Sequence, residues 1–384
     1  MQICILRQTK IKEMKKTFAY RLYPTKEQVT LLEETLEFCR QLYNAALEER
    51  RSAWKIQKIS INVYGQRNQL PEIKESCPEY KQVYAQVLQD VLTRLDKAFQ
   101  GFFRRVKAGE KPGYPRFKGK NRYDSFTFPQ SGFVIENGRL NLSKIGLLKI
   151  KLHRPIEGKI KTLTIRRKNG KWYACFVVEY EPQPLPKTGK QVGIDVGIES
   201  FATLSDGTQI PNPQFFRQGE RKLKILNRIV AKRKKGSKRR KQAVKILAKT
   251  YEHTANQRKD FHHKTARKIV NEFDTIKVEN LNIVGMVKNH HLAKSISDVG
   301  WGQFIAFLSY KAEYAGREFK AVNPHYTSQI CSRCGNIVPK KLKVRVHKCP
   351  YCFLLVHRDH NAALNILGRP GRGPQRESTV RLTL

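Results

Sequence analysis

Four cysteines near the C-terminus constrain the fold of this chain more than any other feature. They form two Cys-x-x-Cys pairs separated by fourteen residues: Cys331, Cys334, Cys349 and Cys352. Each pair predicts a tight turn that presents two thiolates, and two such pairs are typical of a structural zinc site. A redox pair is the alternative, which two pairs in tandem disfavour. We expect one zinc ion in a ribbon spanning residues 328–355, with His347 and His357 left to contact solvent or phosphate.

The other four cysteines show no pairing pattern: Cys4, Cys39, Cys77 and Cys175. Reduced thiols and a zinc ribbon both fit a reducing, cytoplasmic compartment. The N-terminus lacks the apolar stretch of a signal peptide, and no run of about 18 apolar residues predicts a membrane span. The patterned sequence begins just after Met14, which is therefore an alternative start to Met1.

The charge of the chain predicts its partner. The 384 residues include 75 Lys and Arg against 32 Asp and Glu, which gives a formal net charge of +43. Such an excess repels itself unless a polyanion neutralises it, so nucleic acid is favoured over an anionic membrane or an acidic protein. The hydrophobic fraction of 40% is sufficient for packed cores, and the length predicts two or three domains.

The N-terminal part predicts one strand and two long helices. Residues 16–23 alternate as a strand does, and Thr25 with Gln28 predicts a capping box for the following helix. Apolar residues of that helix recur at helical spacing: Leu32, Leu36, Cys39, Tyr43 and Leu47. A second helix is expected over residues 81–107, with its own buried stripe. That stripe comprises Val83, Val87, Val91, Leu95, Phe99 and Phe102.

A β-rich block follows from about residue 109 to residue 180, where the apolar pattern changes to a period of two. Within it, Asn-Gly pairs at residues 137–138 and 169–170 predict two hairpin turns. We expect the N-terminal strand to join this block, with the helices inserted between them.

Three carboxylates in the C-terminal half are candidates for catalysis: Asp195, Glu279 and Asp359. The first two lie in or at the end of short apolar strands, and the third precedes an apolar helix. Each alone could merely end a strand or cap a helix. Together, in a basic protein, they are typical of a site that holds two divalent cations for phosphodiester hydrolysis.

Basic segments are candidates for phosphate contact. Residues 221–241 predict one helix with an apolar stripe: Leu223, Ile225, Ile229 and Val230. Its outer face is expected to contact phosphate through Arg233, Lys234, Lys235, Arg239 and Arg240. A second group mixes aromatic and basic side chains: Tyr114, Arg116, Phe117, Lys118 and Lys120. Core packing is the alternative for its two aromatic members. His262 and Lys264 are weaker candidates for contact with the strand being cut.

Seven segments carry a resemblance to a known family. They read YRLYPTKEQVTLLEE, GYPRFKGK, GIDVGIESFATLSDG, RKDFHHKTARKIV, VENLNIVGM, TSQICSRCG and HRDHNAALNIL. In this order they resemble the transposon-encoded TnpB (OrfB) family, whose RNA-guided DNA nucleases have a RuvC-like domain and are related to type V CRISPR effectors. The resemblance covers nearly the whole chain and implies that Asp195, Glu279 and Asp359 bind magnesium. Two positions depart from the pattern: His357 replaces an acidic residue and Phe353 a glycine.

The resemblance also implies an α+β multidomain fold, in which a β-barrel wedge domain with an inserted helical recognition domain precedes an RNase H-like (RuvC) α/β nuclease domain. The expected boundaries are 14–24 for the first wedge strand, 25–108 for the recognition domain, 109–182 for the wedge, 190–367 for the nuclease, 328–355 for its zinc ribbon and 368–384 for a disordered tail. One monomer per guide RNA is favoured, in the cytoplasm and at the nucleoid of a prokaryote.

The sequence thus predicts an RNA-guided, magnesium-dependent DNA endonuclease of an insertion-sequence transposon, with a guide RNA and double-stranded DNA as partners. A nuclease-inactive, RNA-guided repressor is the first alternative, but it predicts a broken set of acids. A DNA strand-transfer transposase would require a site for the joining step, and none is recognisable. A transposase accessory DNA-binding protein is a further alternative. A zinc-ribbon RNA-binding protein would leave the three acids without a role.

Overall fold

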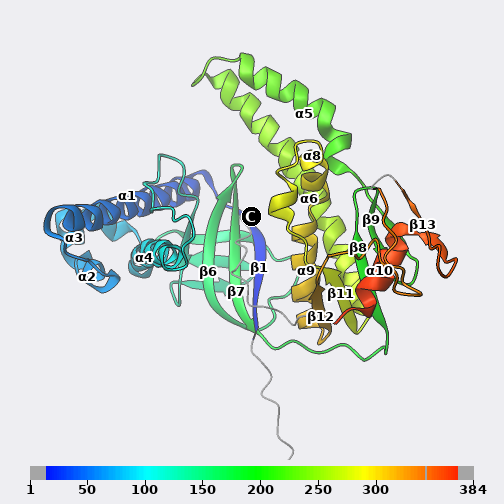
Figure 1. The fold of residues 1–384 in the computed structure, drawn as a ribbon. Helices are drawn as coiled ribbons and strands as arrows, with labels where there is room; N and C mark the ends of the chain where they lie inside the picture. Colours follow the sequence, from blue (N-terminus) through cyan, green and yellow to red (C-terminus); the bar gives the residue numbers. More distant parts are fainter. Residues whose placement is uncertain (1–13, 342–343, 371–384) are drawn as a thin grey trace, which may run out of the picture. The chain divides into compact units, whose positions relative to one another are not determined.

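The computed structural model describes residues 14–341 and 344–370, which divide after Glu181 into two compact units (Figure 1). Met1 and most of the expected disordered tail lie outside the described residues, whereas the alternative start, Met14, is the first described residue. The first residues of that tail are ordered, because the last helix runs to Gly368 and Arg369 donates a hydrogen bond to the carbonyl of His325 at 2.6 Å. Among the described residues, no helix has the length and apolar character needed to cross a membrane.

Unit 1 begins with the predicted strand, β1 (Met14–Tyr23), followed by the long helix α1 (Lys26–Gln57). The capping box of Thr25 and Gln28 is confirmed, since each side chain accepts a hydrogen bond from the backbone amide of the other residue. The remaining helical elements are α2 (Val63–Asn68), α3 (Leu70–Ser76), the 3₁₀ helix η1 (Pro78–Gln82) and α4 (Ala85–Lys107).

Helix α4 begins at Ala85, four residues after the predicted start, because Pro78 opens a 3₁₀ turn instead. Its predicted stripe is buried from Val87 to Phe99. Phe102 is only half-buried and packs edge to face against Tyr114, with ring centroids 5.4 Å apart. The stripe therefore ends one turn earlier than the sequence predicted.

The predicted β-rich block forms a seven-stranded antiparallel sheet with strand order β2-β6-β7-β1-β5-β4-β3. Its other strands are β2 (Ser125–Phe128), β3 (Phe133–Glu136), β4 (Arg139–Leu142), β5 (Gly146–Lys151), β6 (Lys159–Lys168) and β7 (Lys171–Tyr180). β1 lies between β7 and β5, which confirms that the N-terminal strand joins this block. Residues 109–124 contain no strand, so the block begins later than predicted.

Both predicted hairpins are confirmed. They join β3 to β4 and β6 to β7, and all four turn residues have positive φ, from 48° to 71°. The edge strands β2 and β3 are consecutive in the chain, so the sheet curls back on itself and is nearly closed. No backbone pairing joins these two edges within the described residues, and the expected barrel is therefore incomplete.

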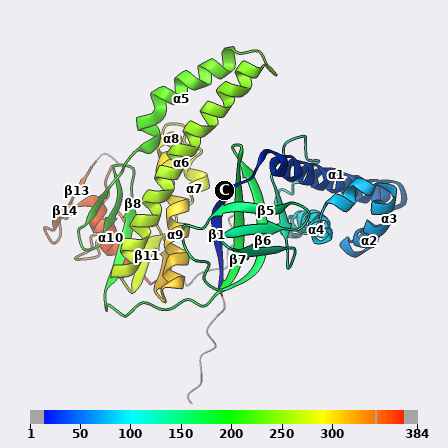
Figure 2. The same ribbon diagram turned by 180° about the vertical axis from the view of Figure 1, so that it is seen from behind.

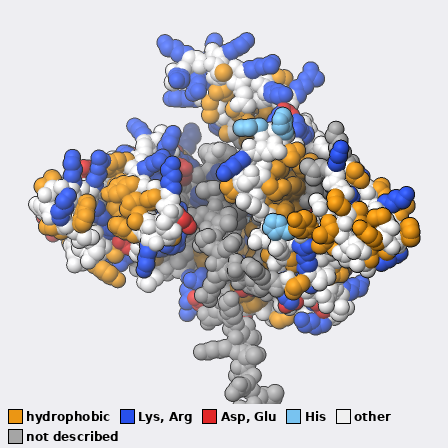
Figure 3. All heavy atoms as spheres, in the orientation of Figure 1, with side chains coloured by type: hydrophobic (Ala, Val, Ile, Leu, Met, Phe, Trp, Pro, Cys, Tyr) orange, Lys and Arg blue, Asp and Glu red, His pale blue; other side chains and the backbone are white. Residues whose placement is uncertain are grey.

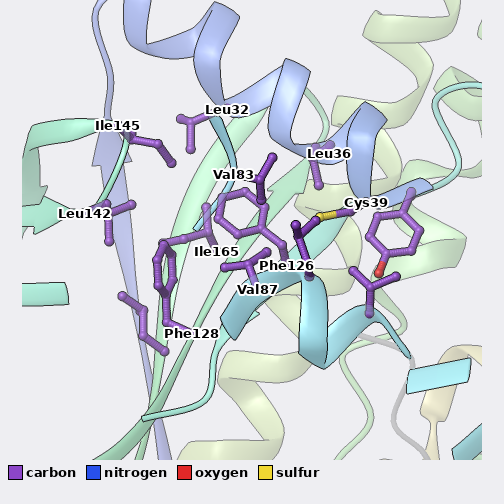
Figure 4. Packing of buried hydrophobic residues seen from close by; sticks show 14 of the residues in the cluster. Leu32, Leu36, Cys39, Val83, Val87, Phe126, Phe128, Leu142, Ile145 and Ile165 are labelled. Carbon is purple, nitrogen blue, oxygen red and sulfur yellow. The ribbon is translucent and has the colours of Figure 1, made fainter. Parts of the chain in front are cut away.

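The core of unit 1 lies between the sheet and helices α1 and α4. Figure 4 shows Leu32, Leu36 and Cys39 of α1 facing Phe126 and Phe128 of the sheet. These five side chains are buried, and so are Tyr43 and Leu47 of α1, which confirms the whole helical stripe predicted for this helix. Burial raises the pKa of the Cys39 thiol to about 12, so this cysteine serves as an apolar core residue.

Unit 2 is built on a mixed five-stranded sheet with strand order β10-β9-β8-β11-β12. The strands are β8 (Gln191–Val196), β9 (Ser200–Leu204), β10 (Gln209–Pro211), β11 (Thr275–Glu279) and β12 (Glu318–Val322). β8, β11 and β12 run parallel, whereas β9 is antiparallel to both of its neighbours. The helices are α5 (Phe215–Lys232), α6 (Lys238–Glu272), α7 (Ile283–Met286), α8 (Ala293–Val299), α9 (Trp301–Tyr314) and α10 (Arg358–Gly368).

Opposite faces of β8 contact different helices. Val192 and Ile194 belong to the buried core that includes residues of α6 and α9. Gly193, which points to the other face, lies against α10. Since side chains alternate along a strand, Asp195 shares the face of Gly193 and is directed to the α10 side of the sheet.

The basic segment 221–241 forms a helical hairpin instead of the single predicted helix. Figures 1 and 2 show α5 and α6 side by side, and residues 233–237 connect them. Gly236, with φ of 86°, makes the turn, and Ser237 caps α6 by accepting a hydrogen bond from Arg240 N at 3.1 Å. Of the predicted apolar stripe, Leu223 is buried but Ile225 is exposed.

Candidate active site

Asp195 and Glu279 lie at the carboxyl ends of adjacent parallel strands. Asp195 is the fifth residue of β8, and Glu279 is the last residue of β11. In the sheet, β8 and β11 are neighbours. The strand that follows β8 in the chain, β9, lies on the outer side of β8, and the strand that follows β11, β12, lies on the outer side of β11. Ligands of open α/β sheets bind at such a switch point, in the crevice outside the carboxyl ends of the strands.

Gly193 brings the third carboxylate to the same place. A Cβ atom at this position would lie 2.2 Å from the carbonyl oxygen of Ala363, so only glycine permits this close approach of α10 to β8. Asp359 lies one helical turn before Ala363 and therefore on the same face of α10. Asp195 lies on the same face of β8 as Gly193, and Asp359 lies on the same face of α10 as Ala363. The contact between Gly193 and Ala363 therefore brings Asp195 and Asp359 into one region.

The electrostatics of the site couple Asp195 to the other two carboxylates. Burial raises the pKa of Asp195 well above its usual range, and the charges of Glu279 and Asp359 raise it further, whereas Arg358 opposes the shift. Burial also raises the pKa of Glu279. Three ionised carboxylates are therefore unfavourable here unless a cation accompanies them.

Polar side chains hold two of the acids. The Thr327 hydroxyl donates a hydrogen bond to Oε1 of Glu279, which partly offsets the rise in the pKa of this carboxyl. Arg358 Nε donates to Oδ1 of Asp359 at 3.1 Å, and Nδ1 of His357 accepts from the backbone amide of Asp359 at 3.3 Å. Thr327 was not predicted from the sequence, because nothing in its local pattern indicates a partner 48 residues away.

The donor set fits magnesium by its chemistry. Carboxylate oxygens are the ligands that this cation prefers, and a partly enclosed acid cluster requires positive charge. Among the described residues, the four cysteines are the one set whose ligand atoms all lie within 4.8 Å of one another.

The four cysteines of the ribbon are arranged as ligands of one ion. The Sγ atoms of Cys331 and Cys352 lie 3.5 Å apart, and those of Cys334 and Cys349 lie 3.6 Å apart. A disulfide would need about 2.05 Å, whereas a tetrahedron of about 2.3 Å zinc–sulfur bonds has edges of about 3.8 Å. The geometry therefore fits the predicted zinc site. The adjoining hairpin pairs β13 (Val346–Lys348) with β14 (Leu355–His357).

Two thiols of the ribbon differ in their readiness to ionise. The backbone amide of Asn336 donates to the sulfur of Cys334 and lowers the pKa of that thiol to about 6. Burial raises the pKa of Cys352 to about 12. Since zinc binds thiolates, its binding would release the protons of this set.

His347 does not contact solvent, contrary to the sequence prediction. Its side chain is 0% exposed, and its Nδ1 atom accepts a hydrogen bond from the ammonium group of Lys340. Its position at the middle of β13 directs it inward. The His357 side chain is 35% exposed, and its Nδ1 atom accepts a hydrogen bond from the backbone amide of Asp359, so part of the ring still contacts solvent, as predicted.

The predicted phosphate-binding residues of the helical hairpin lie at its tip. Arg233, Lys234, Lys235 and Arg239 are exposed, and Arg240 is half-buried. Figure 3 shows Lys and Arg side chains around the end of this hairpin. The guanidinium group of Arg233 also donates to the carbonyl of Arg239 at 2.6 Å, which closes the turn. These positions leave most of the cationic groups accessible to a phosphate backbone.

The prediction that His262 contacts nucleic acid is wrong. It is 0% exposed, lies among the rings of Phe201, Phe261 and Phe304, and its Nε2 atom is 2.9 Å from the carbonyl oxygen of Val299. Burial lowers its pKa to about 4, so the ring is neutral near pH 7.

Lys264, two residues along α6 from His262, is exposed and forms an ion pair with Asp260 at 2.7 Å. Its charge is therefore accessible to a phosphate, as predicted, although the exposed carboxylate of Asp260 already forms an ion pair with it.

The aromatic and basic group of unit 1 lies in the irregular segment before β2. Arg116 and Lys120 are exposed, and so are Tyr114 and Phe117, each 46%. Lys118 is half-buried: its backbone amide donates to Asn44 of α1 at 2.8 Å. The segment is therefore fixed to α1, with aromatic and cationic side chains left accessible on it.

Comparisons with known proteins agree with this architecture. A family model described as "Probable transposase" (OrfB, IS605) matches residues 175–290. A model described as "Cas12f1-like, TNB domain" matches residues 301–366, and a helix-turn-helix domain of the OrfB family matches residues 14–58. The last acid and the four cysteines fall within the second of these matches.

Two relatives align over nearly the whole chain. A protein of Streptomyces pristinaespiralis named "Putative RNA-guided DNA endonuclease" is 34% identical, over 96% of this chain and 94% of its own length. InsQ of Escherichia coli (strain K12), which bears the same name, is 29% identical over 91% of both chains. The solved structure of the mini-RNA-guided endonuclease CRISPR-Cas phi3 shares the fold, with a TM-score of 0.52 at 10% identity over 95% of this chain and 94% of that chain. The chain belongs to the OrfB (TnpB) family of IS605-type elements.

Proposed function

We propose that this protein is an RNA-guided, magnesium-dependent DNA endonuclease of an insertion-sequence transposon, with a single RuvC-like site. The observation that carries the proposal is the convergence of Asp195, Glu279 and Asp359 at the carboxyl ends of β8 and β11. The names of its full-length relatives support the same function. A repressor without nuclease activity would have no use for such a cluster of acids.

In this proposal the three acids hold two magnesium ions. When bound, the ions supply an activated water and neutralise the charge that develops on the cleaved phosphodiester. Asp195 and Glu279 would hold the ions from two neighbouring strands, and Asp359 would hold them from α10. The Arg358 side chain beside Asp359 keeps this carboxylate oriented.

The remaining charge of the chain would bind the guide RNA and the DNA target. A formal net charge of +43 and the exposed basic tip of the α5–α6 hairpin suit a phosphate backbone, which such proteins grip by shape while base pairing selects the sequence. Zinc in the ribbon would be structural, because protein ligands fill all four positions.

We also propose functions for the expected domains. Residues 14–24 and 109–182 would form the wedge, residues 25–108 the recognition domain, and residues 190–367 the nuclease with its ribbon at 328–355. The pairing of β1 with β5 and β7 supports the wedge assignment, because it unites the first strand with the later sheet.

The test is cleavage of a plasmid library by the protein with its co-purified RNA, with and without magnesium. Magnesium-dependent cuts at sites that match the RNA, absent from the Asp195→Asn variant, are expected. Target binding without cleavage by the unmodified protein would instead establish a guided repressor. Cleavage by a preparation that contains no RNA would remove the guidance part of the proposal.

A further inference from the structure

The segment between β12 and the first zinc ligand contains a buried hydroxyl group, that of Thr327. This residue is 3% exposed, and its Oγ1 atom donates to Oε1 of Glu279, which is itself 8% exposed. The carbonyl oxygen of Pro324, 3.1 Å away, is the only other acceptor that the structure gives this hydroxyl among the described residues. A hydroxyl has one proton, and an ionised carboxylate accepts it more strongly than a carbonyl does.

The same segment is fastened to α10, the helix that carries Asp359. Nδ2 of Asn365 donates to the carbonyl oxygens of Thr327 and Ile330 at 2.8 and 2.7 Å. Asn361, which is 0% exposed, donates to the carbonyl of Ile330 at 2.7 Å and accepts from the amide of Ser332 at 2.9 Å. The side chains of Asn361 and Asn365 therefore fix the backbone of this segment to α10, and the hydroxyl of Thr327 is held beside Glu279.

We propose that Thr327 is a positioning residue, which holds Oε1 of Glu279 so that the remaining oxygen faces the divalent cation. The inference rests on the proposed function, since it assigns a role at the same site. Ligating carboxylates need such hydrogen bonds from outside the ligand set, and loss of one typically lowers metal affinity about 10–100-fold. A purely structural role would make the hydroxyl important for folding but not for the affinity of the ion.

Thr327→Val and Thr327→Ser separate these two roles. Valine keeps the shape of threonine and lacks the donor, whereas serine keeps the donor. Both are compared with Asp195→Asn in the zinc-loaded, full-length protein freed of RNA. Binding of Mn²⁺ is measured by electron paramagnetic resonance, with zinc content and melting temperature as measures of folding. In the RNA-loaded protein, the Mg²⁺ concentration that gives half-maximal cleavage is a second readout.

We expect Thr327→Val to bind Mn²⁺ about tenfold or more weakly and to need correspondingly more Mg²⁺, with cleavage recovering at saturating Mg²⁺. Thr327→Ser should stay within about threefold of the unmodified protein. Unchanged Mn²⁺ affinity in a folded Thr327→Val protein overturns the inference. If Thr327→Val lowers the zinc content, Thr327→Cys replaces it, because cysteine has a similar size and only a weak donor. Its Mn²⁺ affinity is then compared with that of Thr327→Ser, and an equal affinity overturns the inference. If Asp195→Asn also leaves Mn²⁺ binding unchanged, the proposed metal site itself is refuted.

Discussion

The two candidate metal sites of unit 2 differ in how the chain assembles them. The four cysteines come from one segment of 22 residues, and their sulfur atoms already have the spacing of zinc ligands. The three acids come from β8, β11 and α10, and depend on the packing of those elements. One site is made by local turns, and the other only by the completed fold.

This difference predicts opposite effects of the metal ions on stability. Among the residues of the ribbon that the structure describes, few apolar side chains are buried, so zinc must supply much of its folding free energy. The acid site is held by the sheet and by α10 whether or not magnesium is bound, and its crowded carboxylates oppose folding. Removal of zinc should therefore unfold a region, whereas removal of magnesium should leave the fold intact but inactive.

The largest expected effect is that of Cys349→Ser. This sulfur is 0% exposed, and zinc binding by comparable sites contributes about 10–16 kcal/mol in isolated peptides. We expect loss of zinc, measured by mass spectrometry of bound metal, and proteolytic sensitivity of residues 328–355. Cleavage should fall as well, because Asn361 and Asn365 connect the base of the ribbon to α10.

The control is Cys77→Ser, a change at a half-buried cysteine that forms no disulfide. Full zinc content in Cys349→Ser would contradict the assignment.

Asp195→Asn should break activity without harming the fold. Loss of a direct ligand should lower cleavage by more than the factor of about 100 that loss of an outer hydrogen bond can cause. The zinc content should remain unchanged. In magnesium-free buffer the melting temperature should rise, because a repelled carboxylate has been removed. Asp206→Asn, at an exposed acid in the turn after β9, should change neither property. A lower melting temperature in Asp195→Asn would argue against electrostatic strain at the site.

The same difference explains what the sequence could and could not predict. The cysteine set was evident from spacing because it is local, and the two hairpins were predicted for the same reason. The convergence of the acids was inferred from their placement and from the family resemblance. The importance of Gly193 could not be seen, since it depends on a helix about 170 residues later.

Two errors of the sequence analysis have local causes. His262 shares helical spacing with the buried residues Ala266 and Ile269, a signal that outweighs the basic surroundings used to place it at the surface. The α5–α6 turn was missed although Gly236 and Ser237 are typical of a helix break followed by an N-cap. The burial of His347 depends on the fold of the ribbon and had no such signal.

Gly193→Ala should affect the acid site and spare the ribbon. The added methyl group would meet the Ala363 carbonyl at 2.2 Å and the Leu367 amide at 2.6 Å, both of them backbone atoms of α10. Such overpacking costs about 1–3 kcal/mol, and it would displace Asp359 from Asp195. We expect weaker cleavage and a lower melting temperature with normal zinc content. Gly368→Ala in α10, where nothing lies within 4 Å, is the matched control. Normal cleavage by Gly193→Ala would show that α10 tolerates a shift.

The smallest expected effect is a dependence of magnesium-free stability on pH. The folded-state pKa of Asp195 lies above its unfolded value of about 3.9, so the folded protein binds more protons than the unfolded chain between the two values. Stability should therefore fall as the pH rises through this window and stay lower above it.

His262, whose pKa is lowered to about 4, acts in the opposite direction, since its contribution to stability is lost as the pH falls from about 6.5. The contribution of Asp195 is isolated by subtracting the free energy of unfolding of the unmodified protein from that of Asp195→Asn at each pH. This difference should grow from near zero at about pH 4 to a plateau at higher pH. It should shrink when magnesium is added. A difference that is constant across pH would mean that Asp195 is not strained by its neighbours, and the contrast between a site opposed by its own charges and a ribbon built by its metal would fail.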